Sequence, residues 1–257
     1  MSLKFVILGS GSSMGVPRAD GYSGNCDLKN KKNFRTRCSA LIKFEDQNIL
    51  IDTSPDLRSQ LLKNNIRSIS KVFYTHLHAD QTHGINDLRP FFLINKKQIP
   101  VYADLNTKKY LFSNFKYCFK SSNDYPSTLS IKNLKKKHQI SSRNKKIILE
   151  TIPVQHGKIK SICYMINNKL AYASDISLFF KKDYKKLKNL EYLIIDCLWY
   201  RNHSAHFNLD QVLELVKILT PRKTILTNMH SDYDYMKLKK KLPKNIIPGF
   251  DGLTVSL

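Results

Sequence analysis

The feature that most constrains this chain is a cluster of three histidines and one aspartate that directly follows an apolar run. Residues 75–84 have the sequence THLHADQTHG, and residues 71–74 before them have the sequence KVFY. Residues two apart point the same way on an extended backbone, so His76 and His78 can bind one metal ion together. Asp80 continues the alternation and offers a hard oxygen ligand for a second ion. The sequence therefore predicts a strand that ends at a metal site. The alternative is a polar loop whose histidines only form hydrogen bonds, and the number of possible ligands disfavours it.

Further motifs stand where other apolar runs end. They are Asp52 after residues 49–51, VQHG at residues 154–157, ASDI at residues 173–176 and LTNMH at residues 226–230. In this order the motifs resemble the metallo-β-lactamase superfamily, whose signature is His-x-His-x-Asp-His. The resemblance implies an α/β fold, the four-layer αββα sandwich known as the metallo-β-lactamase fold. It also implies a set of metal ligands, namely His76, His78, Asp80, His156, Asp175 and His230. Asp52 resembles an early aspartate that supports a ligand without touching the ion.

Gln81 departs from the superfamily signature, because it stands where a histidine usually binds the second metal ion. His83 does not replace it, since two residues of a helical turn rotate a side chain by about 200°. The resemblance leaves the first ion its ligands His76, His78, His156 and Asp175. An amide oxygen binds zinc less well than an imidazole does, so Gln81 weakens the second site. We expect one or two ions of Zn²⁺ or Mn²⁺ in each chain, and an enzyme with a single ion is one of the alternatives.

The pattern of apolar runs predicts a single domain over residues 1–257, made of two β-rich halves at about 1–120 and 147–257. The polar, Lys- and Ser-rich residues 121–146 between them are interpreted as a linker or covering segment. We expect strands at residues 4–8, 40–44, 48–52, 71–74, near 101–102, 147–154, 161–166, 169–174, 192–196, 224–227 and 253–256. Helices are expected at residues 55–64, 107–115, around 178–187 and at 209–219, the last with Asn208 as its N-cap. Two such halves stack as an αββα sandwich.

The composition indicates a cytoplasmic protein. The five cysteines are an odd number without paired CxxC spacing, which favours reduced thiols. The first nine residues are too short an apolar run for a signal peptide and are interpreted as the start of a first strand. No run approaches the about 20 apolar residues of a membrane span, so no membrane partner is expected.

The formal charge of +23 raises the question of a nucleic-acid partner. The basic residues are mostly lysines scattered along the whole chain, as in a general composition bias, and the densest runs fall where solvated faces are expected. A nucleic-acid partner is therefore possible but is not favoured. A small anionic substrate is favoured, and a homodimer is also allowed.

Two histidines precede the last predicted long helix. His203 and His206 lie in the loop after residues 192–196, where a chain can project into a cleft, and they suggest a general acid or a phosphate contact. Surface histidines without a role are the alternative. His138 stands in a lysine run and is interpreted as a solvated histidine. The glycine-rich residues 9–15 are interpreted as a flexible loop beside the site that could offer backbone N–H donors to a substrate.

A narrower resemblance is to the group typified by phosphoribosyl 1,2-cyclic phosphate phosphodiesterases. It is carried by LGSG at 8–11 with GVP at 15–17, RCS at 37–39, IDTSPDLR at 51–58, HGI at 83–85 and DLR at 87–89. That group also has a structural zinc site near its N-terminus, but only Cys26 remains in this region and residue 233 is Tyr, so no structural zinc is expected.

The resemblance implies a metal-dependent hydrolase that acts on a small linear or cyclic phosphodiester. A metal-bound hydroxide would attack phosphorus, and His206 would protonate the departing alkoxide or stabilise the charge that forms on it. The catalytic residues expected on this basis are His206, Asp80 and His203. A tRNA 3′-processing ribonuclease, a thioester or lactone hydrolase and a non-catalytic metal-binding module are the alternatives.

Overall fold

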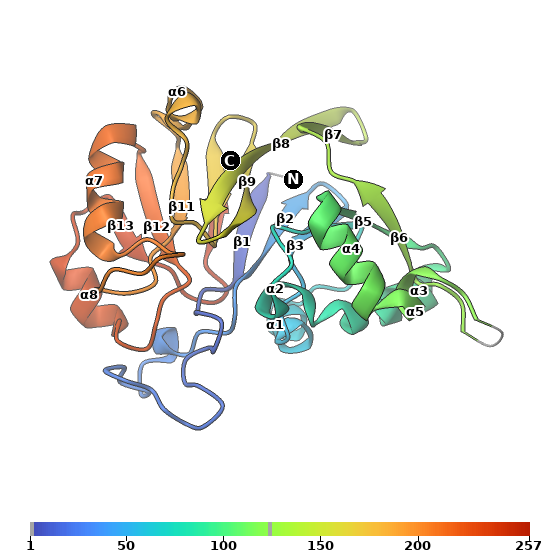
Figure 1. Cartoon of the computed structure of the whole chain (residues 1–257), viewed down its shortest axis with the longest axis horizontal. Coiled ribbons are helices and arrows are strands. Elements are labelled where there is room, and N and C mark those ends of the chain that lie inside the picture. Colours follow the sequence, from blue (N-terminus) through green and yellow to red (C-terminus); the bar gives the residue numbers. More distant parts are fainter. Residues whose placement is uncertain (1–2, 123–124) are drawn as a thin grey trace.

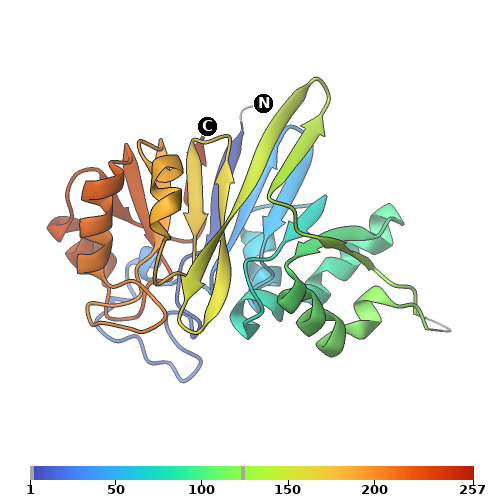
Figure 2. The same cartoon turned by 45° about the horizontal axis from the view of Figure 1, so that its top comes forward.

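Two seven-stranded sheets stack face to face and carry helices on their outer sides (Figures 1 and 2). This computed structural model describes residues 3–122 and 125–257. Met1 and Ser2, where we placed the beginning of the N-terminal run, lie outside the described residues. The αββα sandwich predicted from the sequence is confirmed.

The first sheet has the order β14-β1-β2-β3-β4-β5-β6. Its strands are β1 (Lys4–Gly9), β2 (Ser39–Phe44), β3 (Gln47–Ile51), β4 (Lys71–Phe73), β5 (Ile99–Ala103), β6 (Leu129–Asn133) and β14 (Thr254–Ser256). The second sheet has the order β13-β12-β11-β10-β9-β8-β7. Its strands are β7 (Lys137–Ser142), β8 (Lys145–His156), β9 (Ile159–Ile166), β10 (Leu170–Ala173), β11 (Tyr192–Asp196), β12 (Lys223–Thr227) and β13 (Ile246–Pro248).

Helices cover the outer face of each sheet. They are α1 (Leu57–Lys63), α2 (Ala79–Thr82), α3 (Arg89–Asn95), α4 (Leu105–Asn114), α5 (Lys116–Phe119), α6 (Tyr184–Leu187), α7 (Leu209–Leu219) and α8 (Tyr235–Lys241). Short 3₁₀ turns are η1 (Lys31–Asn33), η2 (Ile85–Leu88) and η3 (Lys181–Asp183). Helices α1, α3 and α4 contribute to the core on the first sheet, and α6, α7 and α8 contribute to the core on the second.

The alternation of side chains along the strands builds three separate cores. In β1, Phe5 and Ile7 belong to the core between the two sheets, whereas Val6 and Leu8 belong to the core beneath the helices of the first sheet. Successive residues of a strand point to opposite faces, so a strand buried on both faces is apolar throughout. This explains the continuous apolar runs of the sequence.

The candidate site lies where several strands end together. β10, β11 and β12 are parallel neighbours, and β3 and β4 are parallel neighbours in the other sheet. Because parallel strands end at the same edge of a sheet, the segments that follow them are gathered there. The polar motifs at the ends of the apolar runs thus meet at one edge of the sandwich.

Helix α7 has the bounds expected from the sequence, and Asn208 is its N-cap. The Asn208 side chain accepts a hydrogen bond from Gln211 N at 2.8 Å, and the Gln211 side chain accepts one from Asn208 N at 2.9 Å. We expect Asn208→Ala to lower the free energy of unfolding by about 1 kcal/mol, because the backbone N–H of Gln211 loses its side-chain acceptor. Urea denaturation would measure the change. Asn208→Ser, which keeps an acceptor, is the control, and equal losses in both variants would contradict the capping role.

Residues 121–146 differ from the expectation of a linker or covering segment. They contain β6 and β7, one edge strand of each sheet, so the segment connects the sheets but about half of it is in strands. Residues 123 and 124 lie outside the described part. Edge strands are often short and rich in charge, which hides their strand character in the sequence. The C-terminal strand β14 also differs, because it pairs with β1 in the first sheet. The helix expected around residues 178–187 shortens to η3 and α6.

The glycine-rich loop is packed rather than flexible. Residues 9–12 are buried, and Gly11 forms bridges with Arg37 and Met229. A Cβ on Gly9 would lie 2.0 Å from the carbonyl oxygen of Arg37, so only glycine fits there. His138 is also corrected: it is not simply solvated, because its ring packs edge-on against Phe73 and Tyr102 at centroid distances of 5.0 and 4.9 Å.

All five cysteines are buried free thiols. Among the described residues, no helix combines the length and the apolar character needed to cross a lipid bilayer.

Candidate metal centre

Three imidazole rings converge at the edge where the strands end. His76 and His78 lie in the turn between β4 and α2, and His156 is the last residue of β8. His78 Nδ1 lies 3.0 Å from His76 Nε2 and 3.3 Å from His156 Nε2. His76 and His156 are buried, whereas His78 is exposed. The structure therefore brings together the three histidines that the sequence assigned to the first ion.

Hydrogen bonds fix two of these rings with a bare nitrogen toward the centre. His76 Nδ1 lies 3.0 Å from Thr75 Oγ1, which donates to Asp52 Oδ2 at 2.8 Å. His156 Nδ1 donates to the carbonyl oxygen of Ala205 at 2.8 Å. Since each Nδ1 carries the hydrogen, each Nε2 presents a lone pair. Asp52 thus supports His76 through Thr75, in the manner expected for it.

The spacing of these nitrogens fits a divalent ion. A tetrahedral zinc site with bonds of about 2.0–2.1 Å has ligand atoms about 3.4 Å apart, close to the distances seen here. Burial, and then the neighbouring His156, hold the pKa of His76 well below its usual value. Burial, and then His206, lower the pKa of His156 to about 4. Both rings are therefore neutral near pH 7, as ligands must be.

Two carboxylates and one amide adjoin the histidines. Gln81 Nε2 lies 2.8 Å from Asp80 Oδ2 and 3.3 Å from Asp175 Oδ2, so it bridges the aspartates expected at the second ion. Burial, and then Asp80, raise the pKa of Asp175 above its usual range. His83 turns away, as the helical rotation indicates, and its Nε2 lies 3.0 Å from the hydroxyl oxygen of Tyr110.

The structure differs from the expectation for His230. The ring of His230 stacks on Trp199 at 4.6 Å between centroids, and its Nδ1 lies 3.6 Å from Asp232 Oδ1. Asn228 approaches Asp175 instead, with its Nδ2 3.3 Å from Asp175 Oδ1. The reason is local: Asn228 directly follows β12 and has a left-handed backbone with φ of 57°. The turn directs residue 228 toward Asp175 and leaves residue 230 beside Trp199.

His206 forms a close pair with a carboxylate that we did not single out from the sequence. Its Nδ1 lies 2.6 Å from Oδ2 of Asp196, the last residue of β11, which is fully buried. Burial lowers the pKa of His206, but the charge of Asp196 and their hydrogen bond outweigh this and raise the pKa to about 9. The ring of His206 lies beside the centre, 4.7 Å from the ring of His156 between centroids. His203 is exposed and lies 5.0 Å from His206 between centroids.

Arg37 supplies a second cation near the carboxylates. Its guanidinium contacts both oxygens of Asp56 at 2.8 Å and lies within electrostatic range of Asp80. A bidentate pair holds the planar guanidinium in a fixed orientation. The half-buried group could thus meet an anion that enters the site.

Cys26 has protein neighbours in the region considered for a structural zinc. Its Sγ lies 3.4 Å from Nη2 of the buried Arg35 and 3.1 Å from the carbonyl oxygen of Ser231. Arg35 Nη2 also donates to the carbonyl oxygen of His230 at 3.0 Å. A guanidinium thus joins the N-terminal loop to the segment that follows β12.

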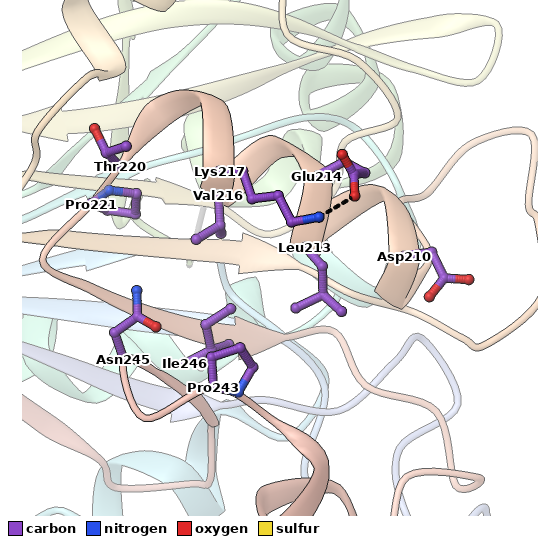
Figure 3. A pocket seen from close by; sticks show the side chains of 10 residues that line it. All are labelled: Asp210, Leu213, Glu214, Val216, Lys217, Thr220, Pro221, Pro243, Asn245 and Ile246. Atoms are coloured by element: carbon purple, nitrogen blue, oxygen red, sulfur yellow. Dashed lines mark hydrogen bonds and ion pairs between the residues drawn. The ribbon is translucent and has the colours of Figure 1, made fainter.

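A second groove on the molecule is lined by none of the candidate metal ligands. It lies beside α7 and β13, and Figure 3 shows Leu213, Val216 and Ile246 directed toward it. Lys217 Nζ lies 2.7 Å from Glu214 Oε1 within the same lining. None of the candidate metal ligands lines this groove, so the reactive groups belong to the histidine cluster.

Comparison with known proteins places this geometry in a family. Residues 47–229 match the model of the β-lactamase superfamily domain. A crystal structure of a new diphosphatase from the PhnP family superimposes with a TM-score of 0.89 at 28% identity, covering 100% of this chain and 98% of that one. The human short-form tRNase Z superimposes with a TM-score of 0.69 at 14% identity, over 98% of both chains, and shows the shared fold.

Relatives found by sequence are longer than this chain. An octanoyltransferase of Porphyromonas gingivalis is 30% identical over 254 residues, which are 98% of this chain and 51% of that protein. A ribonuclease Z of Prochlorococcus marinus is 30% identical over 125 residues, which are 47% of this chain and 39% of that protein. The chain thus spans about half, or less, of the length of these relatives.

Proposed function

Because this chain belongs to the metallo-β-lactamase superfamily of hydrolases, we propose that it hydrolyses small phosphodiesters with the help of a divalent ion, zinc or manganese. One observation carries the proposal: the ligand nitrogens of three imidazoles lie within 4.8 Å of one another, beside the His206–Asp196 pair. The ion would be held by His76, His78 and His156, with Asp175 adjacent.

A divalent ion held there would polarise a phosphoryl oxygen and make water a stronger nucleophile. The side chains of the protein would orient the metal ligands and supply the proton. Thr75 and the carbonyl of Ala205 orient two of the imidazoles, so that their lone pairs meet at one point. His206 carries a proton that it can give to the departing oxygen, while Asp196 holds the ring by its Nδ1. His203 stands at the entrance, next to His206.

Phosphodiester chemistry is favoured over acyl chemistry by the charges around the site. Cleavage of a phosphodiester develops negative charge on the phosphoryl and leaving oxygens, which an imidazolium and a guanidinium stabilise. His206, held by Asp196, and Arg37, whose guanidinium is held by Asp56, are the groups that we assign to these roles. The structural likeness to a diphosphatase supports hydrolysis at phosphorus. The octanoyltransferase name belongs to a protein about twice as long, so it makes octanoyl esters a substrate to test.

The test is a substrate panel with the metal-loaded protein. We expect turnover of 4-nitrophenyl and cyclic phosphodiesters that is lost with a chelator and restored by zinc or manganese, and no turnover of an octanoyl thioester. Binding to precursor tRNA should be weak and vanish near physiological salt, because scattered lysines make only non-specific phosphate contacts.

Three other results would replace the proposal. Salt-resistant binding of tRNA and its cleavage at the 3′ end would establish a tRNA-processing ribonuclease. Hydrolysis of the thioester alone would establish an acyl hydrolase. Tight metal binding without turnover of any ester would establish a metal-binding module.

A further inference from the structure

The place of a second metal ion is taken by amide groups, and we infer that this centre holds a single ion. Gln81 donates from Nε2 to Asp80 and to Oδ2 of Asp175, and Asn228 donates from Nδ2 to Oδ1 of Asp175. Both oxygens of Asp175 thus accept an amide N–H. The inference rests on the proposed metal dependence and concerns the number of ions.

The orientation of Gln81 opposes a second cation. The side chain is fully buried, and its Oε1 has no hydrogen-bond partner. Leaving this acceptor unpaired has a cost, and the arrangement persists because Nε2 faces two carboxylates at once. With the amide reversed, its oxygen would face the oxygens of Asp80 and Asp175. An amide NH₂ carries no lone pair for a metal, and its hydrogens occupy the space between the aspartates.

The remaining ligands suffice for one ion only. The ligand atoms of His156, Asp175 and His206 also lie within 4.8 Å of one another. However, His156 Nδ1 is bonded to Ala205 O, so Nε2 is its single free nitrogen and already belongs to the first group. His206 is engaged through Nδ1 with Asp196, so only its Nε2 can belong to this group. The two groups therefore share the one free nitrogen of His156, which can bind a single ion.

Gln81 and Asn228 act as positioning residues for Asp175 in this arrangement. Two neutral donors fix the carboxylate beside the imidazoles without adding positive charge. Beside this carboxylate, Nδ1 of His206 is held by Asp196, and the guanidinium of Arg37 is held by Asp56. The chain thus combines a one-ion centre with side chains that the protein itself fixes.

Counting metal tests the inference independently of activity. Purified protein is saturated with zinc, passed through a desalting column, and its zinc measured by mass spectrometry. We expect one zinc per chain in the natural protein. The variant Gln81→His with Asn228→His replaces both donors with imidazoles next to Asp80 and Asp175, and it should approach two. Asn95→His, exposed on α3, is the matched control for an added imidazole and should stay at one.

The outcomes separate the inference from the proposed function. Two tightly held zinc ions in the natural protein would overturn the single-ion centre and leave metal-dependent hydrolysis intact. Absence of bound zinc in the natural protein would overturn both. A folded double variant, judged by circular dichroism, that still holds one zinc would show that the amides do not exclude the second ion. If the double variant does not fold, the single Gln81→His variant is measured in its place. Its zinc content should rise above one ion per chain, and an unchanged zinc content would contradict the inference.

Discussion

His156→Ala is expected to remove most of the bound metal and to lower phosphodiester hydrolysis by more than about 100-fold. The effect is large because His156 is the ligand that joins the two sheets: it ends β8 of the second sheet, while His76 and His78 follow β4 of the first. Its ring is fixed by a hydrogen bond from Nδ1 to the carbonyl oxygen of Ala205. The same loss is expected for His76→Ala, whose ring is held by Thr75.

Metal content after desalting and initial rates with excess zinc would check this result together. His83→Ala is the matched control, because His83 belongs to the same motif but faces Tyr110. It should retain metal and activity. Full metal occupancy with normal rates in His156→Ala would refute the assignment of the centre. Activity restored by excess zinc would instead mean that the remaining ligands form a weaker but working site.

The first ligands could be predicted because their geometry is local. His76 and His78 are two residues apart after a strand, and alternation alone makes them point the same way. The apolar runs likewise reveal the buried strands, since β1 and β11 are apolar on both faces. The fold follows from such runs, because few architectures bury both faces of two sheets.

The ligand after β12 could not be predicted in the same way. The choice between Asn228 and His230 depends on the left-handed backbone of residue 228, which no periodicity reveals. His230 was expected as a ligand because the motif at residues 226–230 resembles that of the superfamily's last histidine. The sequence did contain an indication for Asp196 that we did not use. Like Asp52, it is a carboxylate at the end of a buried strand. Its significance depends on the loop that brings His206 back to it.

The edge strands show a different limit. β6 and β7 are mostly polar and only partly buried, so their apolar alternation is weak and their sequence resembles that of a linker. They are strands because neighbours offer free N–H and C=O groups: β6 pairs with β5, and β7 pairs with β8 over six residue pairs. Tertiary pairing, rather than local propensity, decides their structure.

His206→Ala is expected to lower kcat by about 10²–10⁴-fold on phosphodiesters with an alkoxide leaving group, and to leave the bound metal unchanged. The proton that His206 holds is needed in proportion to the basicity of the departing oxygen. With a 4-nitrophenolate leaving group, which departs without protonation, the loss should be much smaller. The ratio of the two losses therefore reports on proton transfer.

Asp196→Asn gives the second half of this test. The amide oxygen still accepts from Nδ1 of His206, but the buried charge that raises the pKa of this imidazole is lost. With the pKa lowered, a smaller fraction of His206 is protonated near pH 7. The rate should therefore again fall more for the substrate with an alkoxide leaving group than for the substrate with a 4-nitrophenolate leaving group. Equal losses on both substrates with retained metal would assign His206 to binding of the phosphate. A fall in metal content would assign it to the ion, and either result would remove the general acid from the mechanism.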